Sequence, residues 1–409
     1  IPEGCYQPEE LDKLVPDISL NNTTPLPEVS IEEEDIASII YTSGTTGFSK
    51  GVVLTHKNLV WDARQCHTIQ PVDETYRFLS ILPMAHTYEN TLGLLLPLMF
   101  GAQVYYLDRV PTPKLLVPAM QKIRPTVVLS VPLIIEKIYK SQVLPKFTSS
   151  KLMSKLYQFA PARKLFNRLA GKKLMETFGG ELKFFGIGGS KLDGTVEQFL
   201  REAKFPYAIG YGLTETAPMA AGSNPSQTFL QGVGPVMEGV QIKINDPDKS
   251  GQGEIWIKGP NVMKGYYKRP ELTAETFTED GWFKTGDLGS FDKKNRLAIR
   301  GRIKTMILGA SGENIYPEEI EDHLNNLPYV CESIVVEKEG KLTALIYPDF
   351  EAINADNKNS DEAIAAIMEE NRKQINETLP AYSQIAKVTI YNEEFEKTPK
   401  KSIKRFLYQ

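Results

Sequence analysis

Residues 41–53 read YTSGTTGFSKGVV, and this stretch decides how the rest of the chain is interpreted. It follows the short apolar run ASIIY at 37–41, which is fit for a buried strand. Backbone N–H groups, hydroxyls and one cation at a common point are what phosphate oxygens need. The stretch is not a Walker A loop, because Ser49 stands where that motif has glycine. It predicts a phosphate-binding loop, with a flexible surface turn as the alternative. The loop candidates are Thr42, Ser43, Gly44, Thr45, Thr46, Gly47 and Lys50.

Downstream of the loop, strand-like and helix-like segments alternate. Their alternation favours an α/β fold with a substantial parallel sheet. The expected strands are 78–83, 102–107, 126–132, 184–189 and 207–212, and the expected helices are 57–65, 88–99, 115–123, 133–140 and 196–203.

After residue 230 the pattern changes to alternating apolar and polar residues at 240–244, 253–259 and 296–302. This predicts antiparallel β structure, as a small barrel or sheet. A third pattern follows, with helices expected at 317–326 and 361–378 and strands at 333–337, 342–347 and 386–391. We therefore expect a large domain over 1–302, β-rich over 230–302, and a small mobile α+β lid domain over 303–409. The expected hinge lies near Arg302–Lys304.

Composition excludes several classes of protein. The 409 residues are 41% hydrophobic and 24% charged, an ordinary globular mix that spans more than one domain. A formal net charge of −4 disfavours a nucleic-acid partner. Three dispersed cysteines and four histidines form no disulfide framework or metal motif. The apolar stretch 91–107 is too short for a membrane span, and the start is not a signal peptide. We expect a cytoplasmic protein, a location that is compatible with peripheral contact with membranes.

Five further motifs follow the loop in the chain. They are LPMAHTYEN at 82–90, GIGGSKLD at 186–193, GYGLTET at 210–216, GWFKTGDLG at 281–289 and GRIKTMILGASGENIYPEEIE at 301–321. Together with the loop, in this order, they resemble the motifs of the adenylate-forming (AMP-binding) enzymes. Within that superfamily the chain looks most like the long-chain fatty acyl-CoA synthetases, and the resemblance covers nearly its whole length.

The resemblance implies roles for the residues of 210–216. Gly210, Tyr211 and Gly212 would adjoin the adenine, for which the tyrosine offers a flat face. Thr214 would offer its hydroxyl to the α-phosphate. Glu215, together with Thr45 of the loop, would hold Mg²⁺, which prefers hard oxygen ligands. The alternative is a plain loop with a helix cap.

The same resemblance implies a ribose site and an adenine wall. Asp287 would accept hydrogen bonds from both ribose hydroxyls, and Arg302 would also hold the ribose. One wall of the adenine site would be formed by Gly189, Ser190 and Lys191. Taken alone, 186–193 is better explained as an ordinary strand-to-helix turn, and the alternative for 281–289 is a Gly-Asp turn.

The remaining implied roles concern the acyl group, the hinge and CoA. His86 would lie near the reacting carboxylate, although a lone histidine is more often structural. Lys304 would be the hinge, and Gly309 and Gly312 would swing towards CoA.

The chain departs from the family at two points. Only 40 residues precede Tyr41, where relatives carry a long stretch, so the chain is either trimmed or incomplete. The family's catalytic lysine position is occupied by Ser402 within TPKKSIKR at 398–405. We expect Lys401 to replace it, and we expect Lys397 and Lys404 to be part of a solvated basic tail.

The implied reaction uses a fatty acid, ATP, Mg²⁺ and CoA. The carboxylate attacks the α-phosphate of ATP, which gives acyl-AMP and pyrophosphate, and the CoA thiolate then takes the acyl group. Two alternatives stay open: an enzyme that loads a carrier protein, and a nucleotide-binding relative without catalysis. Acyl chain length and oligomeric state cannot be deduced from the sequence.

Overall fold

The computed structural model describes residues 29–43, 49–107, 111–148, 150–309, 313–397 and 403–408. Its largest element is a six-stranded sheet in the order β4-β3-β5-β6-β7-β8. Neighbouring strands are parallel except β7 and β8, which are antiparallel. The expected α/β fold is confirmed. The strands are β3 (Arg77–Ser80), β4 (Gln103–Tyr106), β5 (Val127–Ser130), β6 (Phe184–Ile187), β7 (Tyr207–Gly212) and β8 (Met219–Gly222).

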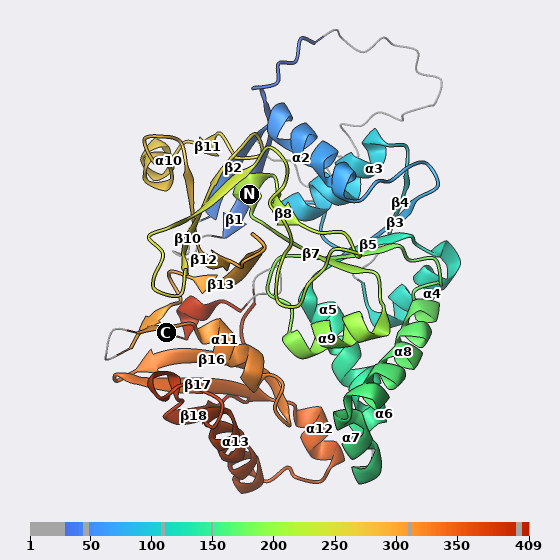
Figure 1. The fold of residues 1–409 in the computed structure, drawn as a ribbon, viewed down its shortest axis with the longest axis vertical. Coiled ribbons are helices and arrows are strands. Elements are labelled where there is room, and N and C mark those ends of the chain that lie inside the picture. Colours follow the sequence, from blue (N-terminus) through green and yellow to red (C-terminus); the bar gives the residue numbers. More distant parts are fainter. Residues whose placement is uncertain are drawn as a thin grey trace, which may run out of the picture.

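Helices cover both faces of this sheet, so its central strands are buried and strongly apolar. All four residues of β5 are buried. Figure 1 shows α2 and α3 on one side of the sheet and α5, α8 and α9 on the other. The helical elements are α2 (His56–Ile69), η1 (Glu89–Leu95), α3 (Leu96–Met99), α4 (Pro113–Ile123), α5 (Pro132–Ile138), η2 (Tyr139–Val143), α6 (Leu144–Thr148), α7 (Lys151–Gln158), α8 (Ala160–Thr177), α9 (Gly194–Ala203) and η3 (Thr214–Thr216).

The apolar run before the phosphate loop lies in β1 (Ile36–Ser43), which pairs antiparallel with β2 (Ser49–Thr55). The strand is present as expected, but the expectation that it is buried is wrong. Ile36 and Tyr41 are 51% and 64% exposed, because β1 is the edge of a three-stranded sheet whose centre is β2. The sequence analysis missed β2, which is the buried strand of this sheet. The third strand is β11 (Gly265–Tyr266).

The β-rich segment forms an open antiparallel sheet in the order β13-β12-β10-β9. Of the two forms expected, the sheet is therefore the one observed. Its strands are β9 (Gln241–Asn245), β10 (Gly253–Lys258), β12 (Phe283–Phe291) and β13 (Leu297–Arg302), and α10 (Pro270–Thr276) lies between β11 and β12 in the chain.

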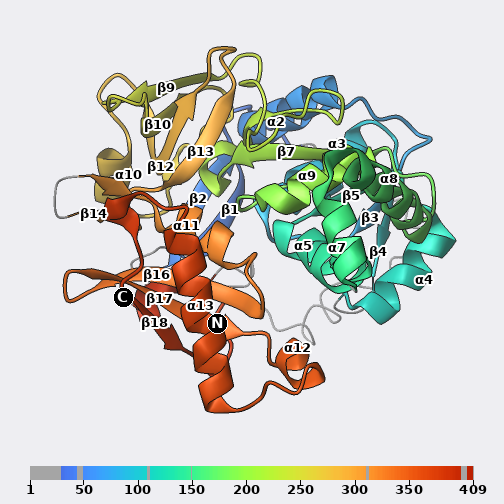
Figure 2. The same ribbon diagram turned by 60° about the horizontal axis from the view of Figure 1, so that its bottom comes forward.

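The C-terminal segment has its own three-stranded sheet, in the order β16-β17-β18, with a separate buried cluster that includes Leu324, Ile346 and Met368. Figure 2 shows α13 lying across this sheet. The elements are β14 (Ile307–Leu308), β15 (Asn314–Ile315), α11 (Pro317–Leu324), β16 (Val330–Lys338), β17 (Lys341–Pro348), α12 (Phe350–Ala355), α13 (Asp361–Asn376), η4 (Ala381–Ser383), β18 (Lys387–Ile390) and η5 (Arg405–Leu407). The separate cluster supports the expected boundary near residue 302, which stays a prediction.

Helices α7 and α8 were not expected from the sequence. In α8, leucines and lysines occur on several sides and blur the helical period, and α7 is only 8 residues long. α8 packs on α9 at Gly171, where an added Cβ would lie 2.6 Å from the Cβ and 2.7 Å from the carbonyl oxygen of Ala203. Among the described residues, every helix is too short or too polar to span a lipid bilayer.

We predict that Gly171→Ala destabilises the protein, although alanine normally favours a helix by up to about 1 kcal/mol. The new methyl group meets backbone that cannot rotate away, and such overpacking typically costs about 1–3 kcal/mol. Urea unfolding should show a lower free energy of unfolding, whereas the exposed neighbour change Lys172→Ala should stay within about 0.5 kcal/mol. A stability gain for Gly171→Ala would contradict the close contact.

Candidate functional site

The predicted adenine and ribose residues meet at one buried carboxylate. Asp287 on β12 is 5% exposed, and its Oδ2 accepts a hydrogen bond from the hydroxyl of Tyr211 on β7 at 2.9 Å. Its Oδ1 lies 3.0 Å from Nε of Arg302, which is its register partner on β13. Burial raises the pKa of Asp287, and the Arg302 guanidinium opposes that rise. Each carboxylate oxygen keeps a lone pair, so Asp287 can accept two further hydrogen bonds.

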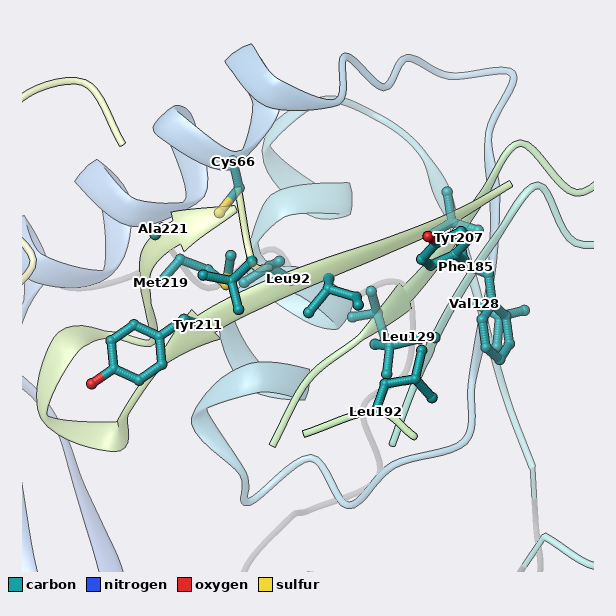
Figure 3. Close-up of a cluster of buried hydrophobic side chains, with 14 of the residues drawn as sticks. Cys66, Leu92, Val128, Leu129, Phe185, Leu192, Tyr207, Tyr211, Met219 and Ala221 are labelled. Carbon is teal, nitrogen blue, oxygen red and sulfur yellow. The ribbon is translucent and has the colours of Figure 1, made fainter. Parts of the chain in front are cut away.

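Tyr211 lies where the apolar core meets this polar group. Figure 3 shows it at one end of a cluster of buried side chains, with its hydroxyl pointing away from the others. Its aromatic ring is part of that core, while its hydroxyl reaches Asp287. Burial and the charge of Asp287 both raise the pKa of Tyr211, so the phenol stays protonated and donates.

The predicted phosphate-binding loop joins β1 and β2, and we call these two strands the phosphate hairpin. Glu215 of η3 faces β11, the strand that pairs with β2 of this hairpin. The hydroxyl of Tyr266 on β11 donates to Glu215 Oε1 at 2.9 Å, and Lys50 Nζ lies 4.9 Å from the centre of the Tyr266 ring. Burial, followed by the charge of Glu215, raises the pKa of Tyr266. Tyr266 therefore brings Lys50 and Glu215 to one place. The sequence analysis missed it, because β11 pairs with β2 across more than 200 residues.

Two side chains that the sequence analysis also missed hold the β7–β8 turn in place. Asn261 is fully buried, and its Nδ2 donates to the carbonyl oxygens of Thr216 at 3.1 Å and Met219 at 2.6 Å. Asp62 on α2, also fully buried, accepts from the Met219 N–H at 3.1 Å. These bonds fix the backbone that carries Thr214 and Glu215. No motif surrounds either residue, so the sequence offered no signal for them.

The phosphate hairpin is described only at its base. In β1 and β2, Thr42 pairs in register with Lys50 and Ser43 with Ser49, so both loop ends are fixed by strand pairing. Thr42 and Lys50 line the same cavity as Glu215. The loop residues Gly44, Thr45, Thr46 and Gly47 lie outside the described residues.

The segment Gly189-Ser190-Lys191 lies where the large N-terminal part meets α11. Lys191 Nζ is 2.9 Å from Asp322 Oδ2, so in this structure the predicted adenine-side lysine pairs with the C-terminal part. Asn326 donates to Asp193, and Lys140 Nζ donates to the carbonyl oxygen of Asn325 at 2.6 Å. These polar contacts hold the two parts together.

One cavity of about 2640 Å³ connects the polar residues to an apolar region beneath the central sheet. Thr214, Glu215, Asp287, Arg302 and His86 line its polar region, and Gly210 and Gly212 border it on β7. Its apolar walls include Phe78, Leu92, Leu96, Met120, Leu129 and Leu174. Such a cavity can hold a charged head and an apolar tail in one molecule.

A buried carboxyl group lies behind this cavity. Glu89 of η1 is 2% exposed, and its Oε1 accepts a hydrogen bond from the hydroxyl of Ser80 at 2.5 Å. Burial raises the pKa of Glu89 to about 7, and the Ser80 hydrogen bond opposes the rise. Gly93 leaves room for the carboxyl group, because a Cβ there would lie 2.5 Å from Glu89 Oε1.

The predicted hinge and CoA-side residues follow β13. Lys304 lies in the turn after Arg302, where the Ile303 N–H donates to the Gly286 carbonyl oxygen at 2.9 Å. Gly309 directly follows β14, and its N–H donates to the Glu313 carbonyl oxygen at 2.8 Å. Gly312 lies outside the described residues.

The basic tail is described on both sides of its tip. Lys397 bridges antiparallel to Ile403, and its Nζ lies 2.8 Å from Glu332 and 3.0 Å from Glu394. Lys404 Nζ lies 3.0 Å from Glu396. The expectation that Lys397 is simply solvated is wrong, because it is 17% exposed between two carboxylates. Lys401 and Ser402 lie outside the described residues.

No cluster of three or more metal-binding side chains occurs within the ranges that the structure describes. Mg²⁺ commonly takes only one or two carboxylates and completes its shell with phosphate and water. The hard oxygens of Glu215 fit that kind of shared site, and Thr45, the other predicted ligand, lies outside the described residues.

Comparison with known proteins agrees with this geometry. Residues 3–267 match the family described as AMP-binding enzyme, and residues 304–408 match the AMP-binding enzyme C-terminal domain. The chain therefore belongs to the AMP-binding enzyme family, the adenylate-forming proteins that the sequence resembles.

Three relatives illustrate the similarity. The long-chain-fatty-acid–CoA ligase heimdall of Drosophila melanogaster is 32% identical over 78% of this chain and 50% of its own length. The long-chain-fatty-acid–[acyl-carrier-protein] ligase AEE15 of Arabidopsis thaliana is 29% identical over 92% of this chain and 59% of its own. ATP-bound MatB from Rhodopseudomonas palustris shares the fold, with a TM-score of 0.75 and 24% identity over 94% of this chain and 69% of its own. The chain spans about half the length of the curated relatives it matches.

We predict that the stability of the protein decreases as the pH rises through 7, in part because of Glu89. The unfolded glutamic acid titrates near 4.5 and the folded one near 7, so only the folded state keeps the proton between these values. The contribution of Glu89 to the free energy of unfolding should be largest below pH 4.5 and should fall by up to about 3 kcal/mol by pH 7. Urea unfolding across pH 4.5–8 measures the slope.

The matched variants are Glu89→Gln and the exposed Glu339→Gln. Glu89→Gln should flatten the pH dependence, because the amide does not titrate, while Glu339→Gln should keep the wild-type slope. An unchanged slope in Glu89→Gln would contradict the assignment.

Proposed function

We propose that this chain is a fatty acid–CoA ligase that works through an acyl-adenylate. One observation carries the proposal: a single cavity joins the Tyr211–Asp287–Arg302 group and Glu215 to a deep apolar wall. A nucleotide and a fatty acid can therefore meet inside it. Several curated relatives are named long-chain-fatty-acid–CoA ligases, which supports the same substrate class.

In the first step the chain brings together two anions that repel each other, the fatty acid carboxylate and the α-phosphate of ATP. Asp287 and Arg302 hold the ribose, Tyr211 adjoins the adenine, and Thr214 donates its hydroxyl to the α-phosphate. Glu215 and Thr45 would hold Mg²⁺, which would supply positive charge at the phosphates. The fatty acid carboxylate then displaces pyrophosphate and forms acyl-AMP. Positioning and fixed charge account for such a reaction without a protein nucleophile.

Lys401 supplies charge where the carboxylate meets the α-phosphate. Lys397 and Lys404 already face carboxylates at 2.8–3.0 Å, which leaves Lys400 and Lys401 as the candidate cations of this segment, and we choose Lys401.

In the second step the C-terminal domain, residues 303–409, turns about Lys304 and brings Gly309 and Gly312 towards CoA. The thiolate attacks the acyl carbon, a thioester forms, and AMP leaves with the bonding electron pair. His86 lies beside the carboxylate at the cavity wall in this scheme. The likeness to AEE15 of Arabidopsis thaliana makes a carrier protein the second candidate acceptor.

The defining experiment is mass spectrometry of one mixture that holds the chain, Mg·ATP, CoA and fatty acids of graded length. We expect acyl-CoA and AMP, with long acids preferred. Acyl-AMP without acyl-CoA would favour a carrier-protein acceptor, and addition of a holo acyl carrier protein would then yield its thioester. ATP binding with neither product would overturn the ligase and leave a nucleotide-binding relative.

We predict that Lys401→Ala slows acyl-AMP formation by roughly 10²–10³-fold, the typical effect of removing one charge from a transition state. Pyrophosphate release measures this step without CoA. Lys404→Ala is the matched control and should stay within about threefold, because Lys404 pairs with Glu396. Full activity of Lys401→Ala would exclude Lys401 as the acting cation.

A further inference from the structure

Helix α8 has an inner row of residues that completes its packing. Arg163 lies 2.9 Å from Glu202 on α9, and Asn167 Nδ2 donates to the same carboxylate at 2.7 Å. Gly171 touches Ala203. Hydrogen bonds, an ion pair and close contact therefore attach α8 to α9 through this row.

The outer row of α8 is apolar in its middle and cationic on both sides. Leu165 and Leu169, one turn apart, are 57% and 62% exposed. Four exposed cations flank them at helical spacing. We call these six residues the leucine–cation face: Lys164, Leu165, Arg168, Leu169, Lys172 and Lys173.

The neighbouring helix α7 extends the exposed apolar surface. Leu152 is 69% exposed, and Leu156 is 40% exposed one turn later. Phe159, which joins α7 to α8, is 64% exposed. α8 runs along the edge of the molecule in Figures 1 and 2. Large apolar side chains gathered at one edge mark an interaction surface.

Charge is concentrated in the same segment. Residues 144–177 contain eight lysines and arginines and one acidic residue, a net charge of +7 in a chain of net charge −4. The rest of the chain is therefore strongly acidic. A partner of this segment should carry negative charge and accept apolar side chains.

We propose that the leucine–cation face, with the exposed apolar residues of α7, binds the surface of a membrane that contains anionic phospholipid. Basic helices with an apolar stripe lie in the bilayer interface, where the stripe enters the acyl boundary and the cations meet the headgroups. A nucleic acid would match the cations but not the leucines. A second copy of the same face would be repelled by its own charge.

The position of the face suits an enzyme that collects a lipid. Leu174, on the inner side of the same helix, lines the apolar region of the cavity. Val117 and Leu133 also line the cavity and are 40% and 38% exposed. The docking itself does not rest on the proposed ligase activity, because binding to a membrane needs neither ATP nor CoA.

The test is co-sedimentation of the purified chain with phosphatidylcholine vesicles that contain or lack 30% phosphatidylglycerol, in 0.1 M salt without nucleotide. We expect binding to the anionic vesicles and little to the neutral ones. Arg168→Glu with Lys172→Glu should lower the partition coefficient roughly 30-fold or more, since each cation contributes about a factor of five. Leu165→Ser with Leu169→Ser should lower it about tenfold or more.

The matched control is Lys338→Glu with Lys341→Glu, which changes the net charge equally on an exposed hairpin of the C-terminal sheet. It should bind like the wild type, and thermal unfolding should show that all three double variants are folded. Equal binding by the control and by Arg168→Glu/Lys172→Glu, or no binding of the wild type to anionic vesicles, would overturn the proposal.

Tighter binding to poly(U) RNA, unaffected by the leucine changes, would assign the face to nucleic acid. A dimer seen by light scattering without vesicles and lost in the leucine variant would assign it to a second copy.

Discussion

A single buried carboxylate connects the two sheets that form the site. Asp287 belongs to the antiparallel sheet, and the tyrosine that donates to it belongs to the central parallel sheet. A buried charge is tolerated only when donors surround it, and here one phenol and one guanidinium supply them. The relative position of the sheets, and with it the shape of the cavity between them, therefore depends on this group.

Two asparagine side chains hold neighbouring backbone segments in place through hydrogen bonds to carbonyl oxygens. Asn58 caps α2 and also donates to the carbonyl oxygens of Pro260 and Val262, at 2.7 and 3.0 Å. Asn261, between those two residues, reaches the turn after β7. The turn that carries Glu215 is thus tied through one short segment to the start of a long helix. Rigid backbone of this kind is what a site that works by positioning requires.

The sequence allowed much of this to be predicted, and the errors have physical causes. The parallel strands were recognised because runs such as VVLS at 127–130 are mostly apolar. The motif residues Tyr211, Asp287 and Arg302 were recognised, but the contact of Tyr211 with Asp287 was not, because it joins two different sheets through residues 76 positions apart. Tyr266 and Asn261 were missed for a similar reason, because the residues they contact lie more than 40 positions away in the chain. α7 and α8 were missed because exposed leucines disguise which side is buried.

The position of Arg302 next to the predicted hinge has a mechanical consequence. Arg302 ends β13, and Lys304 is two residues further on. In a rigid rotation, displacement grows with distance from the axis. If the C-terminal domain turns about Lys304, the contact between Arg302 and Asp287 lies almost on the axis and barely moves, whereas the basic tail sweeps a wide arc. A nucleotide bound by Arg302 and Asp287 can therefore stay in place while the C-terminal domain turns and exchanges the groups around it.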